Sequence, residues 1–200
     1  RLLKLPAARQ AAARAVEPVL RRLDEPKRLA AALEAQLDTS APQAQDGARL
    51  AEAAALWEKV GEPRAAFTAT LRAVALAPAD LRLRAQAERL AEAVSAKDEL
   101  LVTYEALLKL KMPGLDATLP KRVAELHDAL GHRAEALEAW EEAVAAAPDD
   151  TALLQAFADK AKARGDFARL AKALRLQIGK SPATPTRSNL LRELANLCED

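Results

Sequence analysis

The stretch GHRAEALEAWEEAVAAAPDD, residues 131–150, decides how this chain folds. Ala136, Trp140 and Ala143 stand at positions i, i+4 and i+7, which places them on one stripe of an α-helix. The two small residues let a partner helix approach closely, and the indole fills the gap to the next element. The spacing therefore predicts a packing helix and not a reactive site.

Chain breakers flank this helix and recur along the chain. Gly131 permits a tight turn before the helix, and Pro148 ends it because proline lacks the helical N–H donor. One set of breakers contains Asp24, Gly61, Ser95, Gly131 and Gly165, and a second set contains Pro42, Pro78, Pro113, Pro148 and Pro182. Within each set the intervals run from 34 to 37 residues. Two interleaved series with this period predict a helix–turn–helix unit repeated in tandem.

The order of turn, small, aromatic and closing residues in the quoted stretch resembles the tetratricopeptide repeat family. The pattern recurs at Gly61, Ala66, Ala73 and Pro78, and more loosely at Gly165, Phe167, Leu174 and Pro182. The resemblance implies an all-α fold, a right-handed α-solenoid of antiparallel helix pairs, with about five divergent units along most of the chain. The expected ranges of one array over 1–200 are 1–42, 43–79, 80–113, 114–149, 150–183, and a first helix at 184–200.

Pro18 lies inside the first expected helix, in AVEPVLRRLD. Proline removes a hydrogen bond and crowds the carbonyl of Arg14 four residues earlier. We expect the first helix to kink or restart there.

Charge and composition narrow the classes of partner. Thirty Lys and Arg residues against 29 Asp and Glu leave a net charge of +1, so no long-range field attracts nucleic acid. No apolar run approaches the roughly 20 residues of a membrane span. The expected partner is another protein, with no nucleic acid and no membrane span in this segment.

The compartment is constrained less tightly. The single Cys198 excludes an internal disulfide, which fits a reducing compartment, and the enrichment in Ala, Arg and Leu is typical of GC-rich bacterial genomes. We expect the cytoplasm. A periplasmic or envelope-associated location is the alternative, because the chain begins without an initiator Met and its start is interpreted as a cut.

Candidate reactive groups are few. His127 falls at an inward aromatic position, and the five-residue spacing to His132 predicts that the two imidazoles lie on different helix faces. Cys198 is expected to be a buried structural thiol, and neither GxGxxG nor GxxxxGK[ST] occurs. We expect no enzymatic activity, and no catalytic, cofactor-binding or metal-binding residues.

The resemblance also implies where a partner binds. The family's inner, concave face is lined by the first helix of each unit. The corresponding positions here are Arg14, Arg21, Arg22, Lys59, Arg82, Arg89, Lys121, Glu125, Gln155, Asp159 and Lys162. The family's clamp for a terminal carboxylate needs an Asn that is missing at these positions, so we do not predict that ligand.

Three functions fit this description. The first is a non-catalytic scaffold for protein–protein interaction that holds a peptide or helix of its partner in the concave groove. The second is a structural repeat protein that assembles with itself through its uncapped ends. The third is a regulatory or docking arm of a larger enzyme or signalling protein.

Overall fold

The computed structural model describes residues 6–37, 43–110, 115, 118–180 and 185–199. Within these ranges the ordered elements are α1 (Pro6–Arg22), α2 (Pro26–Ala35), α3 (Ala44–Lys59), α4 (Pro63–Leu76), α5 (Leu81–Ala93), α6 (Lys97–Lys109), α7 (Thr118–Leu130), α8 (Arg133–Ala146), α9 (Thr151–Arg164), α10 (Phe167–Lys180) and α11 (Pro185–Glu199). These described residues contain no β-strand. None of the helices described here combines the length and apolar character that crossing a bilayer requires.

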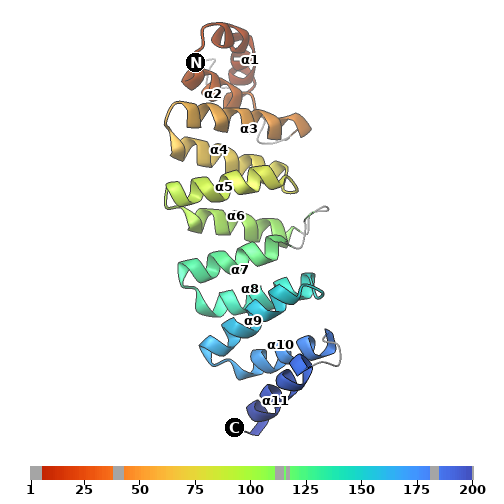
Figure 1. Cartoon of the computed structure of the whole chain (residues 1–200). Helices are drawn as coiled ribbons and strands as arrows, with labels where there is room; N and C mark the ends of the chain where they lie inside the picture. Colours follow the sequence, from red (N-terminus) through yellow and green to blue (C-terminus); the bar gives the residue numbers. More distant parts are fainter. Residues whose placement is uncertain (1–5, 38–42, 111–114, 116–117, 181–184, 200) are drawn as a thin grey trace. The chain divides into compact units, whose positions relative to one another are not determined.

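The helices form two compact units. Helices α1–α6 lie in the first unit, residues 1–115, and α7–α11 lie in the second, residues 116–200. Within each unit a helix packs against its neighbours in the chain, and α4 also contacts α6. Figure 1 shows the helices of each unit running back and forth in succession. The predicted all-α solenoid of antiparallel helix pairs is confirmed within each unit.

The predicted repeat ranges can be compared with the helix bounds. Two helices fall inside each of the first five ranges, and α11 falls inside the last. That these ranges make one array over residues 1–200 stays a prediction. Pro42, Pro113 and Pro182 lie outside the described residues, as does the side chain of Cys198.

The first set of breakers marks the turns within the helix pairs. The backbone φ is positive at each member: 48° at Asp24, 75° at Gly61, 54° at Ser95, 79° at Gly131 and 68° at Gly165. After each of them, the next residue donates its N–H to the carbonyl five positions back, as His132 does to His127 at 2.9 Å. This is the Schellman arrangement, which satisfies carbonyls at the end of a helix. The turns are therefore built alike, although two of them lack glycine.

Aspartates at the second set of turns start the next first helix. The Asp80 carboxylate accepts from the backbone N–H groups of Arg82 at 2.8 Å and Leu83 at 3.3 Å. The Asp150 carboxylate accepts from Leu153 N–H at 3.0 Å. These caps satisfy donors that an α-helix leaves free at its start.

Small residues and a few aromatic rings fill the core of each unit. In the first unit Phe67 and Tyr104 are fully buried, and in the second Phe157 is fully buried and Trp140 is 3% exposed. The small residues with no exposed surface include Ala53, Ala54, Ala66, Ala73, Ala136 and Ala143. The predicted packing role of the stripe in the quoted stretch is therefore confirmed.

The first helix does not restart at Pro18. Helix α1 continues through this residue to Arg22, so of the two expected outcomes, a kink or a restart, the restart does not occur. Pro18 lies in the last turns of α1, where only a short length of helix follows the hydrogen bond that proline removes.

Candidate binding surfaces

Neighbouring first helices of the first unit are joined by ion pairs on one side. Arg21 of α1 pairs with Glu52 of α3 at 2.5 Å, and Arg89 of α5 pairs with Glu58 of α3 at 2.5 Å. We call this side the first-helix face of unit 1. The predicted positions Arg14, Arg21, Arg22, Lys59, Arg82 and Arg89 belong to α1, α3 and α5, and that all of them share this side stays a prediction.

Electrostatics on this face follow from the pairing. Burial raises the pKa of Glu58, but hydrogen bonds from Arg89 and Gln86 outweigh it and leave the pKa below its ordinary value of 4.5. Hydrogen bonds to Glu52 and then to Glu17 raise the pKa of Arg21 above its ordinary value. Glu58 and Arg21 are therefore charged at neutral pH, and the two ion pairs place opposite charges next to each other on this face.

Three arginines on the same first helices are unpaired. Among the described residues, the side chains of Arg14, Arg22 and Arg82 are exposed and have no hydrogen-bonding or ionic partner. Lys59 differs, because its ammonium lies 3.3 Å from the carboxylate of Asp24. The structure therefore divides the predicted cations of unit 1 into paired and unpaired groups.

Predicted residues of unit 2 lie on α7 and α9. On α7, Glu125 pairs with Lys121 at 4.0 Å and with Arg122 at 2.5 Å, both within the helix. On α9, Gln155 donates to Asp159 at 2.9 Å. Lys162 differs, because it pairs with Glu193 of α11 at 2.7 Å and so joins two first helices.

Asp128 holds several groups of unit 2 together, and sequence reasoning missed this role. Its carboxylate accepts from Trp140 Nε1 at 2.9 Å and pairs with Lys160 at 2.9 Å and with Arg164. Burial raises the pKa of Asp128, but the bonds from Lys160, Trp140 and Arg164 outweigh it and leave the pKa below its ordinary value of 3.8. The carboxylate therefore links α7 to α8 and α9.

The two histidines meet, contrary to expectation. The Nδ1 atoms of His127 and His132 lie 3.3 Å apart, so the prediction of separate faces was wrong. Helical spacing does not apply to the pair, because α7 ends before Gly131 and His132 lies beyond it. The Schellman turn at Gly131 brings His132 close to the end of α7. In the described part of the chain, no three His, Cys, Asp or Glu side chains gather as a metal site.

Two pockets of unit 2 lie between α8 and the helices that follow it. The apolar pocket, about 680 Å³, is lined by Glu138, Glu141, Glu142, Val144, Ala145, Pro148, Phe157, Arg169, Lys172 and Leu176. The basic pocket, about 650 Å³, is lined by Arg133, Ala134, Leu137, Lys160, Ala163, Arg164 and Asp166. The predicted binding residues line neither pocket, so sequence reasoning did not find them.

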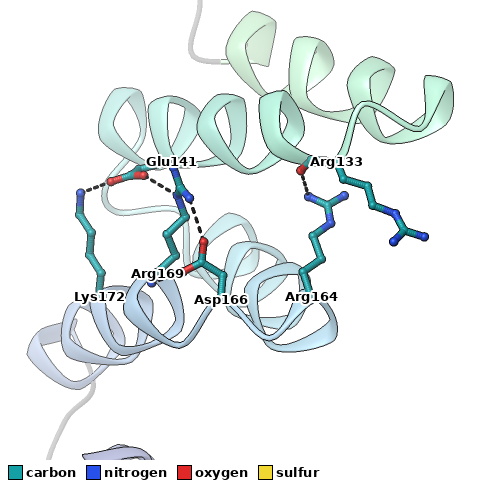
Figure 2. Close-up of polar contacts among 6 residues, drawn as sticks. All are labelled: Arg133, Glu141, Arg164, Asp166, Arg169 and Lys172. Atoms are coloured by element: carbon teal, nitrogen blue, oxygen red, sulfur yellow. Dashed lines mark hydrogen bonds and ion pairs between the residues drawn. The ribbon is translucent and has the colours of Figure 1, made fainter.

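A chain of ion pairs runs between α8 and α10 beside these pockets (Figure 2). Glu141 of α8 pairs with Lys172 and, at 3.0 Å, with Arg169, which also pairs with Asp166 at 2.8 Å. Bonds from Lys172 and Arg169 lower the pKa of Glu141. Backbone and side-chain bonds from Arg169 lower the pKa of Asp166. The two carboxylates and the two cations of this chain therefore compensate one another's charges.

Arg164 and Arg133 lie at the other end of this region. Arg164 donates to the backbone carbonyl of Arg133 at 2.9 Å. The guanidinium of Arg133 contacts none of the other five residues drawn in Figure 2 and has no partner among the described residues. Arg133 is therefore a cation of the basic pocket without a compensating carboxylate.

No protein-family model and no curated protein matches the chain. Solved structures similar to it include MamA, 13% identical, with 87% of this chain and 92% of that chain covered and a TM-score of 0.47. MamA from Desulfovibrio magneticus RS-1 is 15% identical, with coverage of 87% and 98% and a TM-score of 0.44. YrrB, described as a TPR protein with an unusual peptide-binding site, is 16% identical, with 76% of each chain covered and a TM-score of 0.47.

The tetratricopeptide-like character of the chain is visible in its own geometry. The paired helices, the repeated Schellman turns and the buried small residues agree with the pattern that the sequence resembles. Each unit is a TPR-like helical array.

Proposed function

We propose that the chain is a non-catalytic scaffold for protein–protein interaction, and that the first-helix face of unit 1 binds an extended segment or a helix of a partner protein. The observation that carries this proposal is the set of exposed, unpaired arginines Arg14, Arg22 and Arg82 on α1 and α5. Unpaired guanidinium groups favour a segment that supplies carboxylates.

The paired residues of this face support the same proposal. Side chains in the Arg21–Glu52 pair are 44% and 40% exposed, and those in the Arg89–Glu58 pair are 59% and 28% exposed. Ion pairs this exposed contribute only about 0–1 kcal/mol each, so a partner's charges can replace one side of the pair at little cost. The face therefore supplies unpaired arginines and also paired arginines whose carboxylate partner can be replaced by a carboxylate of the bound segment.

We extend the proposal to the first helices of unit 2. Their positions carry mixed charge at Lys121, Glu125, Gln155, Asp159 and Lys162. Because Glu125 and Asp159 are carboxylates, this part of the partner would bring cations or neutral donors. A segment that binds the first helices of unit 2 would therefore differ in charge from a segment that binds unit 1.

A charge-reversal pull-down tests the proposal on unit 1. The variant carries Arg14→Glu and Arg82→Glu, two side chains that have no partner within the described ranges, so the substitutions break no bond seen there. The matched control carries Arg28→Glu and Arg175→Glu, two exposed arginines on second helices that have no partner in the described part of the chain. Partners recovered from a lysate are compared between the two proteins and the parent.

We expect the first variant to lose partners that the control retains. Because each lost charge contact is worth up to about 1 kcal/mol, two reversals should weaken binding by up to about thirtyfold. Circular dichroism confirms that both variants keep their helices. Equal recovery by the two variants would remove the first-helix face of unit 1 as the binding surface.

A further inference from the structure

We propose that unit 2 carries a second docking surface, made of the apolar pocket and the basic pocket together, for a linear segment of a partner protein with a bulky apolar side chain and a carboxylate. This surface lies along α8 and α10 and takes in the end of α9. It differs from the first-helix face, so the inference goes beyond the proposed function and does not rest on it.

The apolar pocket suits an aliphatic or aromatic side chain. Phe157 and Val144 are buried, and Leu176 is half-buried, so the pocket has an apolar floor. Glu138 and Glu142 stand exposed on its rim and have no partner among the described residues. The pocket's cations Arg169 and Lys172 are paired with Glu141, so the unpaired charge on its lining is negative and disfavours a carboxylate there.

The basic pocket suits the carboxylate. Lys160 and Arg164 share the single carboxylate of Asp128, and Arg133 has no carboxylate partner in the described part of the chain. The planar guanidinium of Arg133 matches a carboxylate with two parallel hydrogen bonds. Asp166 lines the same pocket, and its negative charge opposes the denser charge of a phosphate more than that of a carboxylate.

The positions of the pockets along α8 set the spacing of the two groups. Residues 133–137 of α8 line the basic pocket, and residues 138–145 line the apolar pocket. Pro148, just beyond the helix, extends the apolar pocket further in the same direction. With a rise of 1.5 Å per residue, the pocket centres lie roughly 12 Å apart. An extended segment rises about 3.3 Å per residue, so its two groups should stand about four positions apart.

A titration of the full chain, labelled with ¹⁵N and followed by amide chemical shifts, tests this surface. The probe is a short synthetic peptide of glycine and serine with one leucine and one glutamate about four positions apart, blocked at both ends. Three further peptides replace the leucine by alanine, replace the glutamate by glutamine, or place leucine and glutamate next to each other. A fifth peptide carries phosphoserine in place of glutamate.

Two protein variants test the pockets separately. Arg133→Glu reverses the unpaired cation of the basic pocket, and Ala145→Glu places a charge at the exposed edge of the apolar pocket. Arg175→Glu, on α10 and outside both pockets, is the matched control. Arg82→Glu, on the first-helix face, distinguishes binding at these pockets from binding at the face of the proposed function.

We expect the leucine–glutamate peptide to shift amides around both pockets. Losing the carboxylate or reversing Arg133 should weaken binding about fivefold, the value of one exposed charge contact of about 1 kcal/mol. Losing the leucine side chain or introducing the Ala145→Glu charge should weaken it about tenfold. Arg175→Glu and Arg82→Glu should leave the affinity unchanged.

Several results would overturn the inference. They are the absence of saturable shifts at millimolar peptide, shifts away from the pockets, and equal binding of the glutamine or the adjacent-residue peptide. Tighter binding of the phosphoserine peptide would refute the assignment to a carboxylate. Loss of binding on Arg82→Glu would assign the peptide to the first-helix face instead.

Discussion

Replacing Asp128 by asparagine tests how much one carboxylate contributes to the stability of unit 2. The asparagine keeps the shape and an oxygen that accepts from Trp140 Nε1, but it removes the charge that pairs with Lys160 and Arg164. The carboxylate is 14% exposed, and the side chain of Arg164 is 20% exposed. Hydrogen bonds to charged groups contribute about 1.5–3 kcal/mol when solvent is largely excluded, and exposed pairs contribute less than about 1. We therefore expect Asp128→Asn to lower the free energy of unfolding by about 2 kcal/mol at pH 7.

The stability contributed by the Asp128 carboxylate should depend on pH. Because the folded-state pKa of Asp128 lies below its ordinary value of 3.8, the carboxylate stabilises the fold above the pKa of the unfolded chain. That contribution is lost as pH falls through the folded-state pKa. The difference between the parent and Asp128→Asn should therefore be full at neutral pH and shrink as the pH falls below about 4.

Urea unfolding followed by tryptophan fluorescence measures this difference. The chain has two tryptophans, one in each unit, so a Trp57→Phe background leaves Trp140 as the reporter of unit 2. Asp159→Asn is the matched control, because Asp159 is exposed and, among the described residues, accepts from Gln155 alone. This substitution should change stability by less than about 0.5 kcal/mol. Equal stability of parent and Asp128→Asn at pH 7 would refute the reasoning, and so would a difference that does not shrink on acidification.

Thermal and urea unfolding check four further substitutions. Ser95→Gly should stabilise the fold by about 0.5–1 kcal/mol, because Ser95 has a φ of 54° that glycine adopts without strain, and an unchanged midpoint would contradict this. Gly131→Ala should lower stability by about 1 kcal/mol, since its φ is 79° although no atom would meet the added Cβ. Phe157→Ala should cost about 3–5 kcal/mol through the cavity it leaves in a fully buried site, and a loss below 1 would count against the packing described. Glu52→Gln should cost less than about 1 kcal/mol at low salt and nothing measurable at high salt, because the Arg21–Glu52 pair is exposed and screened.

Much of the fold was predictable because it depends on local sequence. A left-handed residue is needed wherever the first helix of a pair ends, and glycine or a short polar residue marks that place at Asp24, Ser95 and Gly131. Alanines at helical spacing indicate which stripe is buried, and Ala136 and Ala143 are indeed fully buried. Such features need only neighbours in the chain to be interpreted.

Errors arose where the local rule stopped applying. Helical spacing separates His127 from His132 only while the helix continues, and the turn at Gly131 ends it between them. The rule for proline allows a kink or a restart at Pro18, and only the structure shows that α1 continues through this residue. For the two histidines the outcome depends on where the helix ends, which the residue types alone left open.

The sequence by itself determined the helices, the turns between them and the buried stripe, because hydrogen bonds and burial within a pair join residues close in the chain. Only the tertiary structure decided which charges meet. Asp128 and Arg164 are 36 residues apart, and Arg21 and Glu52 are 31 apart, so their pairing depends on how one helix pair packs on the next. The same packing left Arg133 without a partner among the residues that the structure describes, in the pocket beside the apolar one. No pattern along the chain marks Arg133, because a surface formed by three helices has no sequence period of its own.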